Sequence, residues 1–161
     1  MTMTRHQTEI IADPNLPTIE IIREFDAPRT RVFRAWTDPK LVARWLGPRS
    51  TETRIDTWDC RTGGSYRYAS VLGDEEYRFY GAFHEVRPDE RLVQTFTYEE
   101  VPDGVSLETA TFEDLDGGRT RVRLLSVVES MESRDSMLAS GMETGVIEGF
   151  EKLDEILTES A

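Results

Sequence analysis

The chain has 161 residues, of which 38% are hydrophobic and 31% charged, a composition typical of one ordinary globular domain. Its formal net charge of −12 repels phosphate backbones and anionic headgroups, which argues against nucleic acid as a partner. A single cysteine, Cys60, excludes an intrachain disulfide, and no apolar run reaches the roughly 18 residues of a membrane span. We therefore expect one cytoplasmic domain over residues 1–161, with residues 1–7 as a mobile tail and without membrane insertion.

The first third of the chain predicts strands followed by two short helices. Apolar stretches on both sides of the turn residues Asp13–Pro17 predict a short strand and then a strand over Ile19–Phe25. The segments 28–36 and 38–46 each carry a proline that suits the first helical turn, followed by apolar residues at helical spacing. Two short helices are therefore expected back to back.

Between Ser50 and Val128 the hydrophobic pattern has a period of two, which is typical of antiparallel strands. Turn residues separate the runs at short intervals. With Ile19–Phe25 the pattern predicts seven strands, and a sheet of this length must curl. The six predicted here are Thr51–Trp58, Ser65–Val71, Glu76–Val86, Arg91–Glu99, Val105–Glu113 and Arg119–Val128.

The last segment, 133–158, carries one apolar stripe at helical spacing and predicts a single long helix. Gly141, Gly145 and Gly149 share one face of it, although each glycine costs a helix roughly 1 kcal/mol relative to alanine. Two explanations stay open, close packing against the sheet and room left for a ligand. The order of elements predicts an α+β fold in which one curved antiparallel sheet grips one long helix.

The residue types of most catalytic and metal sites are missing or isolated. His84 stands alone in a strand, and no paired His or Cys has the spacing of metal ligands. Cys60 has no histidine near it in sequence and is interpreted as a packed side chain beside a turn. The acidic pairs at strand ends are interpreted as a solvated rim. We predict no catalytic residue, no metal and no cofactor.

Aromatic residues recur on alternate strand positions, so each set faces one side of the sheet. If that side is concave, it faces the apolar stripe of the last helix across a cleft, with tyrosine hydroxyls as polar anchors. The alternative is that these side chains only fill the core. The predicted lining consists of Trp58, Tyr66, Tyr68, Tyr77, Phe79, Phe83, Phe96 and Tyr98 from the strands and of Met142, Val146 and Phe150 from the helix.

A set of short motifs occurs in order along the chain. They are Arg23–Pro28, Val32–Pro39, Trp45 with Gly47-Pro48, Asp59 with Gly63-Gly64, Tyr77–Gly81, Pro88–Val93 and Gly118–Thr120. Together they resemble the motifs of the activator of heat-shock protein 90 ATPase homologue-like family, in the START/Bet v 1-like (SRPBCC) superfamily. The resemblance covers about Ile19–Leu157 and implies a helix-grip fold, a seven-stranded antiparallel sheet around the long helix, with a hydrophobic tunnel. Gly149-Phe150 stands where this family often has Gly-Trp, which removes an indole N–H donor.

Three functions remain open at the level of sequence. The first is binding of a small hydrophobic or aromatic molecule between sheet and helix. The second is an enzyme of the cyclase, dehydratase or hydrolase type in the same cavity, for which His84 is a candidate base, although strand alternation places it outward. The third is an interaction module, as a homodimer or with a stress or chaperone partner. Arg23 is interpreted as part of a structural ion pair.

Overall fold

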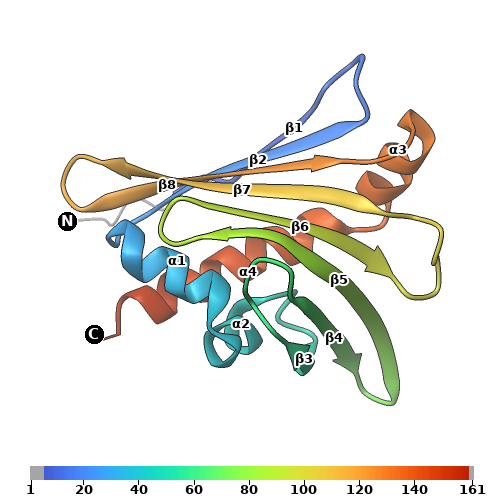
Figure 1. Ribbon diagram of the computed structural model, residues 1–161, viewed down its shortest axis with the longest axis horizontal. Coiled ribbons are helices and arrows are strands. Elements are labelled where there is room, and N and C mark those ends of the chain that lie inside the picture. The colour runs from blue at the N-terminus through green and yellow to red at the C-terminus, as the bar shows by residue number, and fades with distance from the viewer. Residues whose placement is uncertain (1–5, 160–161) are drawn as a thin grey trace.

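The structure, a computed structural model, describes residues 6–159 (Figure 1). The strands are β1 (Glu9–Ala12), β2 (Thr18–Phe25), β3 (Glu52–Trp58), β4 (Ser65–Leu72), β5 (Glu75–Arg87), β6 (Arg91–Tyr98), β7 (Ser106–Leu115) and β8 (Arg119–Val127). The helices are α1 (Arg29–Thr37), α2 (Pro39–Trp45), α3 (Met131–Ala139) and α4 (Met142–Leu157). Of the predicted tail, residues 1–5 lie outside the described part, whereas His6 hydrogen-bonds to Asp26 at 2.8 Å.

One antiparallel sheet contains all eight described strands, in the order β1-β2-β8-β7-β6-β5-β4-β3. The predicted count of seven rises to eight, because the short strand expected before Asp13–Pro17 is present as β1 and pairs along β2 from Glu9–Ile22 to Ala12–Ile19. Four residues are too short a run for their hydrophobic pattern to predict this pairing. The boundaries of the other strands agree closely with the alternation pattern.

The predicted single C-terminal helix is two helices, because the chain breaks at Gly141. This glycine has φ of +88°, a left-handed conformation that costs side-chain-bearing residues free energy, and it precedes the first turn of α4. α3 is fixed by Arg134, whose Nη1 donates to the carbonyls of Asp13 (2.6 Å), Leu16 (3.0 Å) and Thr18 (3.3 Å). No helix in residues 6–159 is long and apolar enough to cross a membrane.

The helices cover one side of the curved sheet (Figure 1). An aromatic cluster joins them to it. Trp36 of α1 lies at its centre, with ring centroids 4.7 Å from Trp45, 5.6 Å from Phe112 and 5.9 Å from both Phe25 and Phe150. Such aromatic pairs add stabilisation beyond the area they bury. The cluster therefore connects β2, β7, α1, α2 and α4.

The two α4 glycines that follow the break have different surroundings. A Cβ on Gly149 would lie 2.9 Å from the carbonyl oxygen of Trp45, so α4 approaches the end of α2 more closely than any side chain permits. A Cβ on Gly145 would meet only Pro48, at an ordinary 3.5 Å. Close packing therefore accounts for Gly149, whereas the helix could accept a small side chain at Gly145.

A buried ion pair fixes α4 to β2. Arg23 is 2% exposed, and its guanidinium donates to both carboxylate oxygens of Asp154, at 3.0 and 2.5 Å. The guanidinium carbon also lies 4.8 Å from the centroid of the Phe25 ring. The predicted structural ion pair at Arg23 therefore forms across the sheet–helix interface, while the nearby Asp26 binds His6 and Arg119.

Replacing Asp154 with alanine should lower the free energy of unfolding by about 2 to 4 kcal/mol, because it leaves the Arg23 charge buried without a counter-ion. Urea denaturation at neutral pH measures this change. Asp59→Ala, which removes the partner of the exposed Arg61, is the control and should cost less than about 0.5 kcal/mol. Equal losses in the two variants would contradict a dominant role for the buried pair.

The two glycines should respond in opposite directions to alanine. Gly149→Ala should destabilise the fold by about 1 to 3 kcal/mol, because the added methyl group forces α4 away from the Trp45 carbonyl. Gly145→Ala should stabilise it by up to about 1 kcal/mol through helix propensity. Thermal and urea unfolding of the two variants test the contrast, and destabilisation by Gly145→Ala would show that this position is also tightly packed.

Candidate functional site

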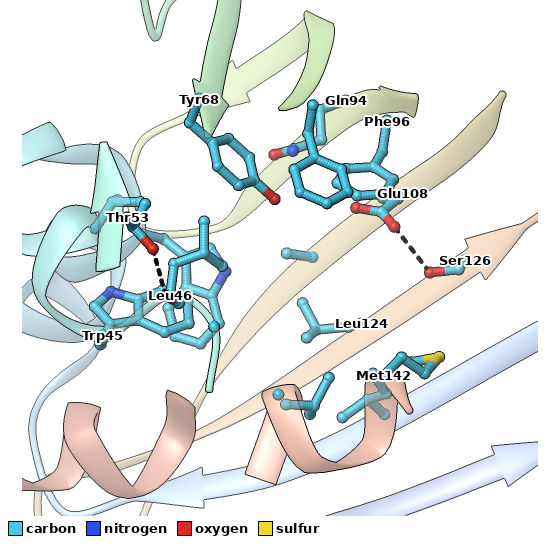
Figure 2. Close-up of a pocket in the computed structure, with 18 of the residues that line it drawn as sticks. Trp45, Leu46, Thr53, Tyr68, Gln94, Phe96, Glu108, Leu124, Ser126 and Met142 are labelled. Atoms are coloured by element: carbon cyan, nitrogen blue, oxygen red, sulfur yellow. Dashed lines mark hydrogen bonds between the residues drawn. The ribbon is translucent and has the colours of Figure 1, made fainter. Parts of the chain in front are cut away.

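A cavity of about 360 Å³ lies between the sheet and the helices (Figure 2). Its sheet wall comes from β2 through β8, and its opposite wall from α1, α2 and α4 with Met137 of α3. The aromatic cluster of Trp36, Trp45 and Phe150 borders one side of this space. The cavity exists because one helix cannot fill the whole concave face of a strongly curved sheet.

Most of the aromatic and helix residues predicted from strand alternation lie around this cavity. They are Trp58, Tyr66, Tyr68, Phe79, Phe96, Met142, Val146 and Phe150. A β-bulge lies between Ile55 and Thr57 of β3, and Trp58 beyond it pairs with Tyr66. That these side chains contact a ligand stays a prediction.

Three of the predicted lining residues lie elsewhere. Phe83 is 1% exposed and packs behind the cavity wall, with its ring 5.4 Å from Trp58 and 5.1 Å from Tyr66. Tyr77 and Tyr98 lie beyond the cavity, where their hydroxyls donate to Glu75 and Glu100. Alternation along a strand correctly predicts which residues share one face of the sheet. The position along the strand decides which of these residues reach the cavity.

The polar groups of three aromatic side chains at the cavity donate hydrogen bonds to backbone carbonyls. Trp45 Nε1 donates to the Ala35 carbonyl at 2.9 Å, and Trp58 Nε1 to the Thr37 carbonyl at 2.7 Å. The Tyr66 hydroxyl donates to the Thr95 carbonyl at 2.6 Å. These bonds hold the walls in place, and they leave Tyr68 as the tyrosine whose hydroxyl can serve as the predicted polar anchor.

Sequence reasoning missed a polar cluster on the sheet wall. Glu108 of β7 faces the cavity, and its Oε2 accepts a hydrogen bond from the Ser126 hydroxyl of β8 at 3.2 Å (Figure 2). Gln94 of β6, directly opposite Glu108 in the register, also lines the cavity. Strand alternation could have placed Glu108 on the inner face of the sheet, because it lies two and four residues before the buried Ala110 and Phe112.

Burial raises the pKa of the Glu108 carboxyl to about 7, while the hydroxyls of Ser126 and Ser106 act in the opposite direction. The desolvation comes from the apolar walls around the cavity. No Arg, Lys or His lines the cavity, and within residues 6–159 no cation forms an ion pair with Glu108. The carboxyl can therefore exchange a proton near neutral pH, and its ionised form has no counter-charge from the described chain.

The other candidates from sequence lie away from this cluster. His84 is exposed on the outer face of β5, as strand alternation predicts, so it cannot reach the cavity. Cys60 packs against the core, and burial raises the pKa of its thiol to about 11, which keeps it protonated and weakly nucleophilic. Among residues 6–159 no group of three or more His, Cys, Asp or Glu side chains could hold a metal ion.

The chain is similar in sequence and in fold to known proteins. The family model described as activator of Hsp90 ATPase homolog 1-like protein matches residues 26–158. Protein Ms6760 of Mycobacterium smegmatis superposes with a TM-score of 0.86 at 26% identity, over 98% of this chain and 99% of that one. A protein of Arthrobacter aurescens gives 0.85 at 30% identity, over 95% and 92%. No curated protein matches the chain.

Replacing Glu108 with glutamine should stabilise the protein at high pH and change little at low pH. The pKa of Glu108 is near 4.5 in the unfolded state and about 7 in the folded state. Ionisation of Glu108 therefore lowers the free energy of unfolding progressively between these pH values, and the full loss is reached above pH 7. Allowing for partial exposure, the advantage of Glu108→Gln should grow by about 2 kcal/mol from pH 4.5 to pH 8.5.

Urea denaturation of both proteins across this pH range measures the difference. Glu113→Gln is the matched control, since it removes the same charge from the outward face of the same strand. A stability difference between wild type and Glu108→Gln that is independent of pH would contradict the burial of an ionisable Glu108.

Proposed function

Because the chain belongs to the activator of Hsp90 ATPase homolog 1-like family and encloses an apolar cavity, we propose that it binds a small, mainly hydrophobic or aromatic molecule. The observation that carries the proposal is this cavity, bounded by aromatic rings on both walls. Its volume of about 360 Å³ lies within the roughly 300–1,000 Å³ of small-molecule sites.

The composition of the walls supports a ligand rather than a defect of packing. Tyr68, Phe79 and Phe96 form a continuous row of rings on the sheet, with successive centroids 5.1 and 5.2 Å apart. Met142 and Val146 of α4 border the cavity on the helix side. A few polar groups within such an apolar surface are typical of sites that orient a small molecule.

An enzyme that uses the same cavity is the second candidate, and Glu108 is the observation that favours it. A carboxyl with a pKa of about 7 in a partly desolvated site can act as general acid or base at neutral pH. Proton transfer would then depend on Glu108 and not on the exposed His84. Homodimer formation, a chaperone partner and a cytoplasmic location stay predictions from sequence.

Filling the cavity should weaken binding without unfolding the protein. We expect the neutral fluorophore N-phenyl-1-naphthylamine to bind wild type with one site per chain and increased fluorescence. Val146→Trp places an indole into the cavity from α4 and should weaken this binding at least about 10-fold. Fluorescence titration measures the affinities, and circular dichroism confirms that the variant is folded.

Thr144→Trp is the matched control, because Thr144 is exposed on the same helix and does not line the cavity. Its affinity for the fluorophore should equal that of wild type. Unchanged binding by Val146→Trp would place the fluorophore elsewhere and overturn the proposed site.

A further inference from the structure

We propose that the cavity selects hydrophobic molecules that carry a protonated amine, with the Glu108 carboxylate and the Tyr68 hydroxyl binding the ammonium group. This inference rests on the proposed function and defines the chemical class of its ligand. Glu108 and Tyr68 approach the cavity from β7 and β4, on the sheet wall opposite α4 (Figure 2).

The first argument is the missing counter-charge at Glu108. Many other described carboxylates form an ion pair with an arginine, as in Arg23–Asp154 and Arg67–Glu99. Glu108 instead accepts a hydrogen bond of 3.2 Å from the neutral Ser126, and the other hydroxyl that acts on it, that of Ser106, is neutral as well. Burying an ionised carboxylate among apolar groups costs free energy unless a cation binds to it. The described residues supply no such cation, so the ammonium group of a ligand can form this charge-assisted interaction.

The second argument is the unsatisfied hydroxyl of Tyr68. This residue is only 9% exposed, and its hydroxyl makes no hydrogen bond to any residue in the described range 6–159. Figure 2 shows the hydroxyl directed into the cavity on the side of Glu108. Buried hydroxyls are nearly always hydrogen-bonded, so Tyr68 offers an acceptor and donor that a ligand can satisfy.

The third argument is the aromatic surface beside the carboxylate. The row of rings formed by Tyr68, Phe79 and Phe96 lies on the sheet wall next to β7, where Phe96 pairs with Ser106, two residues before Glu108. Aromatic faces attract cations through their quadrupoles, and more strongly where water is excluded. A carboxylate together with aromatic faces therefore favours a cation over a neutral group of the same size.

Charge argues against ligands of the opposite kind. No Arg, Lys or His lines the cavity, so a carboxylate or phosphate inside it would find no cation and would face Glu108. The net charge of −12 also raises the local concentration of cations and lowers that of anions. Free fatty acids and other anionic lipids are therefore poor candidates.

Two probes of matched shape test the inference, 1-naphthylmethylamine and 1-naphthylmethanol, in isothermal titration calorimetry at pH 8. The amine should bind wild type at least about 10-fold more tightly than the alcohol, because only the amine forms a charge-assisted bond. Glu108→Gln should remove this preference while leaving the affinity for the alcohol unchanged. Tyr68→Phe should reduce the preference, and Glu113→Gln on the outer face should preserve it.

The preference should also depend on pH, falling from pH 8 to pH 5 as Glu108 takes up a proton. The other titratable groups that face Glu108 are Tyr66 and Tyr68 of β4, both with pKa values raised by burial and so neutral across this range. The remaining facing groups, Gln94, Ser126 and the apolar residues of α3 and α4, do not titrate. Loss of the preference on acidification is therefore expected from Glu108 alone.

The outcomes separate this inference from the proposed function. Equal binding of the two probes, or a preference that persists in Glu108→Gln, would overturn the amine subsite while the cavity remained a binding site. Absence of binding by both probes would overturn the ligand-binding proposal and the amine subsite together.

Discussion

The close approach of α4 to the end of α2 is the constraint on which the rest of the structure depends. At Gly149 the helix axis comes so near the Trp45 carbonyl that a methyl group would not fit. This approach packs Phe150 against both Trp36 and Trp45 and aligns Asp154 with the buried Arg23. The C-terminal half of α4 is therefore fixed by tight packing and by charge, at one end of the sheet.

The same constraint explains why the cavity lies where it does. α4 is held tightly at Gly149, and towards its N-terminus it borders empty space at Gly145, Val146 and Met142. An apolar cavity carries a free-energy cost, and this fold retains one where close-packed cores have none. Glu108 adds a further cost, since its ionised form is desolvated at neutral pH. Structural costs concentrated around one cavity are typical of functional sites.

Much of this architecture could be predicted from the sequence, because period-two alternation and helix signals are local. The family, the antiparallel sheet and the boundaries of most strands follow from such patterns. Local patterns could not reveal the pairing of the four-residue β1 or the break at Gly141, which depends on a backbone conformation. Strand alternation placed Phe83 and Tyr98 on the correct face of the sheet, but their distance from the cavity depends on tertiary packing. Glu108 was overlooked because an acidic residue on a strand is usually solvated, although its parity with Ala110 and Phe112 indicated the inner face.

The residues around the cavity are divided between the sheet and the two helices on either side of the break at Gly141. The groups that can recognise a ligand stand on strands, at spacings fixed by the pleat and by the register of Glu108 against Gln94. The groups that set the available volume stand on the first turns of α4 and on α3, which Arg134 ties to the β1–β2 turn. Substitutions on the helices can therefore change the volume and shape of the cavity while the polar chemistry on the sheet stays as it is. Under the proposed function, changes in a few helix residues would suffice to admit new ligands of one chemical class.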